Sequence, residues 1–441
     1  MLRPPGPKPS PIVGNLPIAA PDPLALFSRW AAEYGDIFYY RALWKRVYFL
    51  NHPDYIEYVL VRNPRNFMKD PTLRNARWLL GDGLLTSEGE HWKRQRRLIQ
   101  PAFHRDCIAG FADIMTGCTQ DMLYRWRSGT EIDLHREVMQ LTLRIVVRCL
   151  FSAERVETAE ISRSMDILMK GNTGGRQLLP GWVRRLPLPG TGEVRHAAKA
   201  LDRAVRQIVT RRRATGATGS DLLGLLLAAR EQDGGRMDDR QIRDEVMTFF
   251  LAGHETTALA ISWAFYALSR NPNAECKLQE ELDRVLSGRA PKLSDVPALV
   301  WTEGVIKESM RLYPPAWALG RVAINDFELG GYRIPKGALI VMSPWLMQRD
   351  DRYFADAETF DPSRWTRVET QNLPRFAYFP FGGGPRQCVG NSFAIMEAVL
   401  LLAMIARRFT IQIDPSTPVA PVIGFTLRPR NGIPARVVER A

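Results

Sequence analysis

The chain has few of the residues that build disulfide frameworks and metal clusters. Its 441 residues include only five cysteines and six histidines. No two cysteines stand in C-x-x-C spacing, and no histidines stand in H-E-x-x-H or H-x-H spacing. This pattern argues against a disulfide framework, a zinc site or an iron–sulfur cluster, and it favours a reducing compartment.

Long apolar runs are also scarce. The chain starts Met1-Leu2-Arg3-Pro4-Pro5 and shows no apolar stretch typical of a signal peptide or an N-terminal anchor. Residues 246–268 are apolar enough to consider a membrane span, but His254 and Glu255 fall near the middle, where charge is costly in lipid. We expect a long buried helix there, and a cytoplasmic protein.

Acidic residues are outnumbered, with 47 Asp and Glu against 60 Lys and Arg and a net charge of +13. Runs such as residues 94–97 and 211–213 could indicate nucleic acid, but aromatic residues do not interleave with them as a base-stacking surface requires. We expect no nucleic-acid partner. The basic residues favour a solvated face or a docking surface for an acidic protein.

The remaining pattern indicates one mainly α-helical domain with small β-sheets over residues 1–441, opening on a proline-rich segment of residues 1–20. Asp238 and Asp239 are placed to cap a helix that ends near Asn271-Pro272. At 1.5 Å per residue such a helix reaches about 50 Å. We expect further helices at residues 274–286, 300–312 and 391–402, and strands within residues 36–50, 333–334, 339–342 and 410–438.

Cys388 is the most informative residue. It follows Phe381-Gly382-Gly383-Gly384-Pro385-Arg386-Gln387 and precedes an apolar segment that we expect to be helical. Free N–H groups and the helix dipole favour an anion at such a terminus, so we expect the pKa of this thiol to lie below its usual value. A thiolate in such a loop suits a haem iron with a cysteine ligand. A buried structural cysteine is an equally good interpretation of this loop alone.

The segment Ala252-Gly253-His254-Glu255-Thr256-Thr257 lies in the middle of the long predicted helix. A glycine there costs about 1 kcal/mol relative to alanine, and a threonine can bond to the carbonyl four residues back and bend the helix. These residues can open a groove for a small molecule beside an acid that relays protons. A kinked core helix is the alternative.

Two further spacings are suggestive. Glu308 and Arg311 lie three residues apart on one predicted helix face, and Arg364 could complete a structural charge network. Trp92 and Arg96 lie four residues apart, so an indole N–H and a guanidinium could hold one carboxylate.

Together these residues resemble the cytochrome P450 haem-thiolate monooxygenases. The loop at Cys388 matches F-x-x-G-x-R-x-C-x-G at every fixed position. The motifs A-G-x-[DE]-T-T, E-x-x-R and W-x-x-x-R and the opening P-P-G-P also occur, in the family's order. The resemblance extends from Pro4 to residues 426–429.

The resemblance implies the P450 fold, with haem b (iron protoporphyrin IX) between the long central helix and the helix after the cysteine loop. Cys388 would be the axial thiolate ligand, with Thr256 and Glu255 managing oxygen and its protons. The other cofactor-binding residues would be Trp92, Arg96, Arg321, Arg386, Phe381, Gly382, Ala252 and Gly390. The substrate pocket would include Leu84, Leu85, Phe249, Ala252, Ala316, Trp317, Leu319 and Phe425, with further walls at residues 165–188. Glu308, Arg311 and Arg364 would form the structural triad.

By the same resemblance we expect a monomer that inserts one oxygen atom from O2 into an apolar small molecule by hydroxylation or epoxidation. No flavin or iron–sulfur module is left in the sequence, so electrons would come from a separate ferredoxin- or flavodoxin-type reductase system, docking near Arg94 and Arg97. Residues 182–188, with Trp182, Leu186 and Leu188, favour a substrate-access lid over a peripheral membrane contact. The alternatives are a peroxide-dependent or rearranging haem-thiolate enzyme, and a non-catalytic haem-binding protein.

Overall fold

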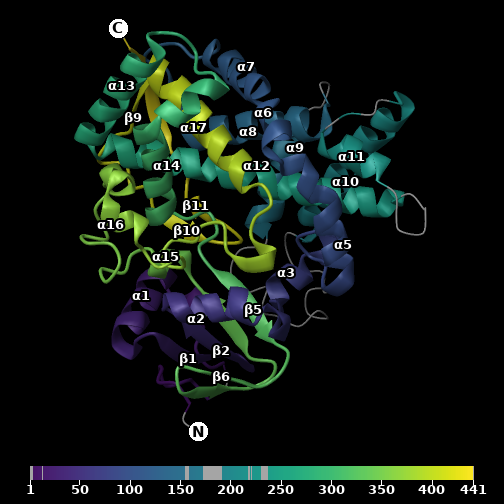
Figure 1. The fold of residues 1–441 in the computed structure, drawn as a ribbon, viewed down its shortest axis with the longest axis vertical. Helices are drawn as coiled ribbons and strands as arrows, with labels where there is room; N and C mark the ends of the chain where they lie inside the picture. The colour runs from purple at the N-terminus through teal and green to yellow at the C-terminus, as the bar shows by residue number, and fades with distance from the viewer. Residues whose placement is uncertain are drawn as a thin grey trace.

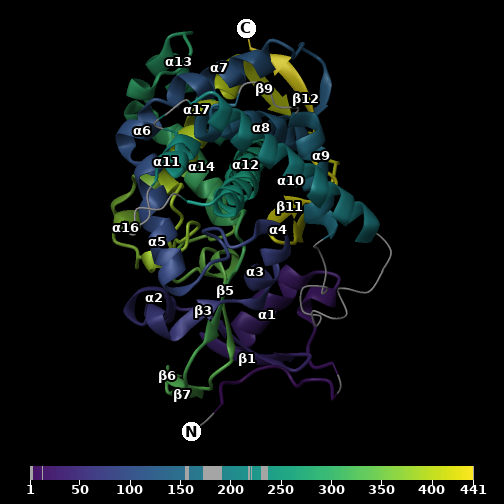
Figure 2. The same ribbon diagram turned by 90° about the vertical axis from the view of Figure 1, so that its right-hand side faces the viewer.

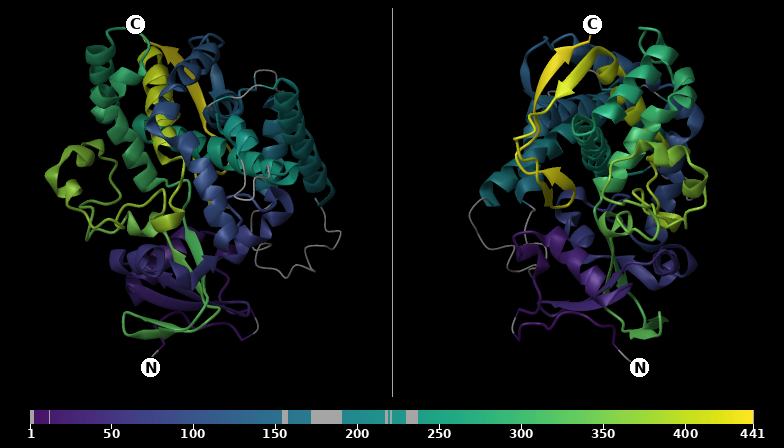
Figure 3. Two further views of the ribbon diagram at one scale, coloured as in Figure 1. Left: turned by 45° about the vertical axis from the view of Figure 1, so that its right-hand side comes forward. Right: turned by 90° about the vertical axis from the view of Figure 1, so that its left-hand side faces the viewer.

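The computed structural model describes residues 3–11, 13–153, 158–171, 191–216, 219, 221–229 and 237–440. A β-sheet region lies at the N-terminal end of the molecule and a larger helical region at the C-terminal end (Figures 1 and 3). The helices confirm the predicted class. They are α1 (Pro23–Tyr34), α2 (Pro53–Glu57), α3 (Pro71–Asn75), α4 (Arg77–Leu80), α5 (Gly89–Ile99), α6 (Arg105–Ala109), α7 (Ala112–Leu123), α8 (Leu134–Phe151), α9 (Thr158–Gly171), α10 (Thr191–Ala214), α11 (Leu222–Ala228), α12 (Asp239–Ser269), α13 (Pro272–Leu286), α14 (Val300–Leu312), α15 (Pro344–Met347), α16 (Val368–Gln371) and α17 (Asn391–Arg408).

In the described part of the chain, the strands form four small sheets. The largest has the order β1-β2-β8-β5-β3 and consists of β1 (Ile37–Ala42), β2 (Lys45–Leu50), β8 (Leu339–Met342), β5 (Leu319–Ala323) and β3 (Phe67–Lys69). β12 (Pro434–Glu439) pairs with both β4 (Glu131–Asp133) and β9 (Phe409–Gln412). Two hairpins complete the set: β6 (Phe327–Leu329) with β7 (Tyr332–Ile334), and β10 (Pro421–Ile423) with β11 (Leu427–Pro429).

Helix α12 runs through the middle of the helical region, where Figure 2 looks along its axis. The Asp238 side chain caps its first turn by accepting a hydrogen bond from the backbone N–H of Gln241, as the sequence predicts. Helices α8, α10, α14 and α17 pack against it. Within the described residues, no helix combines the length and the apolar composition needed to cross a bilayer.

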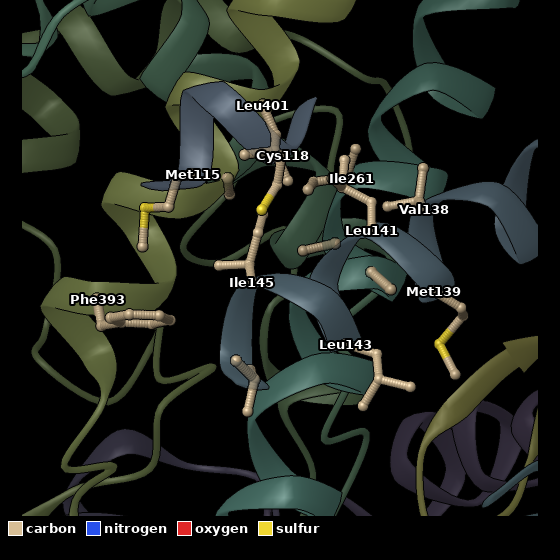
Figure 4. Packing of buried hydrophobic residues seen from close by; sticks show 14 of the residues in the cluster. Met115, Cys118, Val138, Met139, Leu141, Leu143, Ile145, Ile261, Phe393 and Leu401 are labelled. Carbon is tan, nitrogen blue, oxygen red and sulfur yellow. The ribbon is translucent and has the colours of Figure 1, made fainter. Parts of the chain in front are cut away.

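The principal core lies where α7, α8, α12 and α17 meet (Figure 4). Met115 and Cys118 of α7, Ile145 of α8, Ile261 of α12 and Leu401 of α17 are all completely buried there. Because apolar side chains from four helices converge, this core fixes the position of α17 relative to α12. Helix α17 follows the cysteine loop, and α12 carries the threonine motif.

Most predicted elements appear close to their expected positions, and α14 has the expected bounds. Helix α17 runs six residues past the expected Leu402. The sequence analysis gave no separate strand for β3 or β5. The proposed lid residues Trp182, Leu186 and Leu188 lie outside the described residues, as does most of the wall expected at residues 165–188.

Candidate functional site: a cavity between α12 and the Cys388 loop

The Cys388 loop is a tight backbone structure that ends at the start of α17. Its turn η9 (Gly384–Arg386) packs against η2 (Tyr58–Arg62), and the backbone N–H of Cys388 donates to the carbonyl of Phe381 at 3.0 Å. Gly384 has φ +68°, and a Cβ atom there would lie 1.8 Å from the Leu60 carbonyl oxygen. Only glycine fits this position, since both the backbone conformation and the space exclude a side chain.

Cys388 is exposed where its side chain lines a cavity, while the protein packed around the loop desolvates the sulfur. Burial raises the pKa of its thiol, while the backbone N–H of Gly390 and the charge of Arg96 act in the opposite direction without cancelling that effect. The expectation of a lowered pKa was therefore wrong for the protein by itself. The helix terminus gives the sulfur a hydrogen bond, but not enough to outweigh desolvation.

Four cationic side chains line one part of the same cavity: Arg96 of α5, Arg321 of β5, Arg386 of the cysteine loop and Lys69 of β3. Arg96 donates from Nη1 to the Gln387 carbonyl at 2.7 Å, and Arg386 donates to the Ser87 carbonyl at 3.2 Å. Burial lowers the pKa of Arg96, Arg321 and Arg386, the last to about 10. Such a group of cations is suited to an anion with more than one carboxylate.

Lys69 belongs to this group and was missed in the sequence. It lies opposite Arg321 in the β3–β5 ladder, and its Nζ donates to the carbonyls of Leu84 at 2.9 Å and Ser87 at 3.1 Å. Burial, together with the neighbouring charges of Arg386 and Arg321, lowers the pKa of Lys69 to about 7, although Glu88 and Glu245 act in the opposite direction. A negatively charged ligand at this position would relieve the repulsion among the cations.

Trp92 lies beside these cations. The Arg386 guanidinium stacks over its indole ring, with 4.2 Å from Cζ to the ring centroid. The structure thus brings together Trp92, Arg96, Arg321 and Arg386, which the sequence analysis had grouped only by resemblance.

Helix α12 lines the cavity through Ala252, Gly253 and Thr256. The Thr256 hydroxyl donates to the Ala252 carbonyl at 2.9 Å, which is the contact four residues back that the sequence suggested. Gly253 also has a packing role, because a Cβ atom there would lie 3.1 Å from a methyl group of Val146 in α8. Gly253 therefore leaves room for Val146 of α8 as well as for the cavity.

Glu255 is almost completely buried and lies at the edge of the cavity. It accepts hydrogen bonds from the Thr426 hydroxyl and from Nε of Arg428, whose Nη1 also contacts Asp166 of α9 at 3.2 Å. Burial raises the pKa of Glu255, but the Arg428 guanidinium and the Thr426 hydroxyl outweigh it and leave the pKa below its usual value. This carboxylate is therefore held ionised, and Arg428 must loosen its contact before Glu255 can carry a proton.

The cavity has a volume of about 750 Å³. Besides Cys388 and the cations, its lining includes the eight residues named for the substrate pocket, Leu84, Leu85, Phe249, Ala252, Ala316, Trp317, Leu319 and Phe425, whereas residues 165–168, the part of the further predicted wall whose side chains the structure describes, do not line it. Phe381, Gly382 and Gly390 line it too. The cavity also reaches Leu16 of the N-terminal segment, Phe27 of α1 and Tyr40 of β1, which the sequence did not predict.

Glu308, Arg311 and Arg364 meet outside the cavity, where all three are buried. Arg311 of α14 donates twice to Glu308, at 2.9 Å and 2.8 Å, and Arg364 donates from Nε at 3.2 Å. Arg311 also donates to the carbonyls of Gln348 and Ala357. The network therefore ties the long coil after α15 to α14.

The lining of this cavity suits a flat metal complex that carries two carboxylates. One thiol points into it from a glycine-rich loop, four cations line one part of it, and the rest is mainly apolar. A family model described as "Cytochrome P450" matches residues 4–433. The chain belongs to the cytochrome P450 family. Proteins of this family bind haem through a cysteine thiolate, which matches the single thiol at the cavity wall.

Bacterial relatives of this P450 align over nearly its whole length. Cyclooctatin synthase of Streptomyces melanosporofaciens is 37% identical over 432 residues, which cover 96% of this chain and 94% of the relative. Pentalenene oxygenase of Streptomyces avermitilis is 36% identical over 433 residues, covering 98% and 96%. Cyclooctat-9-en-7-ol 5-monooxygenase of S. melanosporofaciens is 36% identical over 411 residues, covering 92% and 89%. The P450 is a haem-thiolate monooxygenase that uses O2, a redox partner and an organic substrate.

Proposed function

We propose that this P450 inserts one atom of O2 into an apolar, uncharged substrate by hydroxylation or epoxidation, and that it does so as a monomeric haem domain over residues 1–441. The observation that carries the proposal is that the Cys388 thiol, the Thr256 hydroxyl and an apolar wall all line one cavity. Haem bound through Cys388 supplies the oxygen and redox chemistry.

The chain's own residues have separate roles in this proposal. Arg96, Arg321, Arg386 and Lys69 bind the two propionates of the haem, since they lie together in the cavity lining. Thr256 holds a proton at its hydroxyl near the reacting oxygen, and Glu255 supplies protons once Arg428 releases it. Non-polar side chains exclude water and orient the substrate.

The substrate class is supported by the lining and by the relatives. Leu84, Leu85, Phe249, Leu319 and Phe425 present carbon surfaces to the cavity. Two relatives are named for pentalenene and for cyclooctat-9-en-7-ol. We propose a substrate of the same broad, apolar kind.

The redox partner is proposed to be an acidic ferredoxin or flavodoxin. Lys93, Arg97 and Arg65 all lower the pKa of the exposed Glu90, Lys93 most strongly, so three cations surround one carboxylate at the start of α5. Arg65 lies in η3 (Pro64–Asn66), which packs against η2, and η2 in turn packs against η9 of the cysteine loop. If the interaction is electrostatic, reduction by the partner slows as salt is raised and slows again in Arg97→Glu. Reduction rates that do not depend on salt would contradict this docking.

The thiolate claim is tested by the spectrum of the reduced protein with carbon monoxide. The wild type should show the band for which the family is named, and Cys388→Ser should lose it. A wild type without this band would refute the proposed function. Products are then sought with O2 and a generic reductase pair, and separately with peroxide. Products that form only with peroxide would favour the peroxide-dependent alternative.

Thr256→Ala tests the proton role. Without the hydroxyl, we expect electron consumption to continue while more of it ends in peroxide than in product. Thr257→Ala is the matched control on the next residue of α12. Equal coupling of electrons to product in the wild type and in Thr256→Ala would remove Thr256 from the mechanism.

A further inference from the structure

The loop of residues 81–88, between α4 and α5, is fastened to α12 by two consecutive carboxylates. Asp244 Oδ2 accepts from the backbone N–H of Asp82 at 2.8 Å. Glu245 Oε2 accepts from the backbone N–H of Leu84 at 2.9 Å. Both carboxylates are buried, with exposed fractions of 3% and 0%. Losing either acceptor would leave a buried backbone N–H without a partner, which costs about 1–3 kcal/mol.

The loop backbone approaches α12 so closely that it leaves no room for side chains. Gly81 has φ +61°, and a Cβ atom there would lie 2.0 Å from the Asp244 carboxylate. A Cβ atom on Gly83 would lie 2.4 Å from the Thr248 hydroxyl and 2.6 Å from the Asp244 carbonyl. The two glycines and the two carboxylates therefore form one interlocking contact.

The opposite side of the same loop is fastened by the cations of the cavity. Lys69 Nζ donates to the Leu84 carbonyl at 2.9 Å, and Arg386 donates to the Ser87 carbonyl at 3.2 Å. The Leu84 backbone is thus held by Glu245 at its N–H and by Lys69 at its carbonyl. Both groups are buried and belong to separate elements, so the loop has little freedom to shift.

A buried carboxylate at Glu245 has an energetic cost, because burial raises its pKa to about 8. Apolar side chains occupy the neighbouring positions Val246 and Met247 of α12 at no such cost. The hydrogen bond to the loop, together with the 2.9 Å contact from the Gln241 amide, accounts for an acidic residue here.

The loop forms part of the pocket wall, since Leu84 and Leu85 line the cavity. We propose that Asp244 and Glu245 are positioning residues that hold this wall at a fixed place and thereby decide which carbon of the substrate is oxidised. Thr256 follows Glu245 by 11 residues on the same helix, about 16 Å along its axis. The carboxylates that hold the wall and the Thr256 hydroxyl therefore belong to the same helix, α12. The inference that this wall decides which carbon is oxidised rests on the proposed function.

Amide hydrogen exchange of the holoprotein tests the contact itself. In Asp244→Ala and Glu245→Ala, the amides of Asp82 and Leu84 respectively should exchange about ten- to a hundredfold faster, because each loses its hydrogen-bond acceptor. Asp239→Ala is the matched control, since Asp239 is an exposed acid on the same helix that pairs with Arg213. Wild-type exchange at these amides in the two alanine variants would overturn the proposal.

Glu245→Gln is the conservative variant. Its amide oxygen can still accept from the Leu84 N–H, so exchange at Leu84 should stay within about threefold of wild type. Should the alanine variants fail to fold, Gly83→Ala tests the contact from the loop side. Its Cβ atom would collide with Thr248, so exchange across residues 82–86 should again rise. Unchanged exchange in Gly83→Ala would overturn the proposal.

Product analysis tests the role of the wall. With a substrate that the wild type converts mainly to one product, the alanine variants should give mixed products at a similar total rate, while Asp239→Ala keeps the wild-type ratio. A wild-type ratio in variants with a loosened loop would overturn the selectivity role. If no substrate is oxidised by any form, the proposed function fails, whereas the exchange result still decides whether the carboxylates hold the loop.

Discussion

The buried carboxylate of Glu308 allows a quantitative prediction. Its Oε1 accepts from Arg311 Nη2 at 2.8 Å, Asp361 N at 3.0 Å and Arg364 Nε at 3.2 Å. Its Oε2 accepts from Arg311 Nε at 2.9 Å and Trp365 Nε1 at 3.0 Å. In Glu308→Gln an NH2 group replaces one oxygen. Whichever way the amide turns, at least two of the five donors lose their acceptor, and at least one of these belongs to an arginine.

The expected cost follows from those losses. A hydrogen bond to a charged group contributes about 1.5–3 kcal/mol, and breaking a buried ion pair from one side costs about 3–5 kcal/mol. We therefore expect Glu308→Gln to lower the free energy of unfolding by about 3–5 kcal/mol. Urea unfolding of the holoprotein followed by circular dichroism measures this, and haem absorbance in the same titration reports whether cofactor loss coincides with unfolding.

Glu303→Gln is the matched control. Glu303 lies on the same helix and pairs with Lys307 at 2.7 Å, with both side chains 34% exposed. We expect this variant to change the free energy of unfolding by less than about 1 kcal/mol. Equal effects of the two substitutions would refute the argument that the buried network stabilises the fold.

Three further predictions concern other buried groups. The raised pKa of Glu245, about 8 against an ordinary 4.5, means that the folded protein keeps a proton that the unfolded chain loses between these pH values. The free energy of unfolding should then fall by up to about 5 kcal/mol as pH rises from 4.5 to 8, and pH-resolved urea titrations should show a shallower slope in Glu245→Gln. Arg428→Met removes the guanidinium that lowers the pKa of Glu255, so the pKa of this buried carboxyl should rise. Infrared difference spectra across a pH titration should show a protonated carboxyl band in this variant, and its absence would contradict the assignment. Gly384→Ala should prevent haem incorporation, because its Cβ atom would overlap the Leu60 carbonyl, and wild-type haem content in this variant would refute that reading of the loop.

Local sequence patterns predicted the long elements well. Asp238 and the Asn271-Pro272 pair mark the ends of α12, and the prolines after Tyr313 stop α14. Capping and helix-breaking residues act over a few positions, so the sequence shows them directly. The cysteine loop was equally visible, because its glycines and Arg386 lie within seven residues of Cys388.

The missed features depend on contacts between distant parts of the chain. Strand β3 has three residues, too few for a periodic pattern, and Lys69 reaches the cavity only because β3 pairs with β5 some 250 residues later. Glu255 was expected to relay protons beside the threonine, but its carboxylate is held by Thr426, between β10 and β11, and by Arg428 of β11. The predicted direction of the shift in the thiol pKa was wrong because burial, a property of the whole fold, outweighs the effect of the local helix terminus.

The reach of the cavity into the N-terminal sheet has a consequence for evolution and engineering. Leu16, Phe27 and Tyr40 line the same cavity as Cys388, although more than 340 residues separate them from it in the chain. Exchanging only the first fifty residues between two related enzymes should thus transfer part of the preference for molecular size and shape, while leaving the oxygen chemistry untouched. Natural recombination near that boundary would offer a short route to new products.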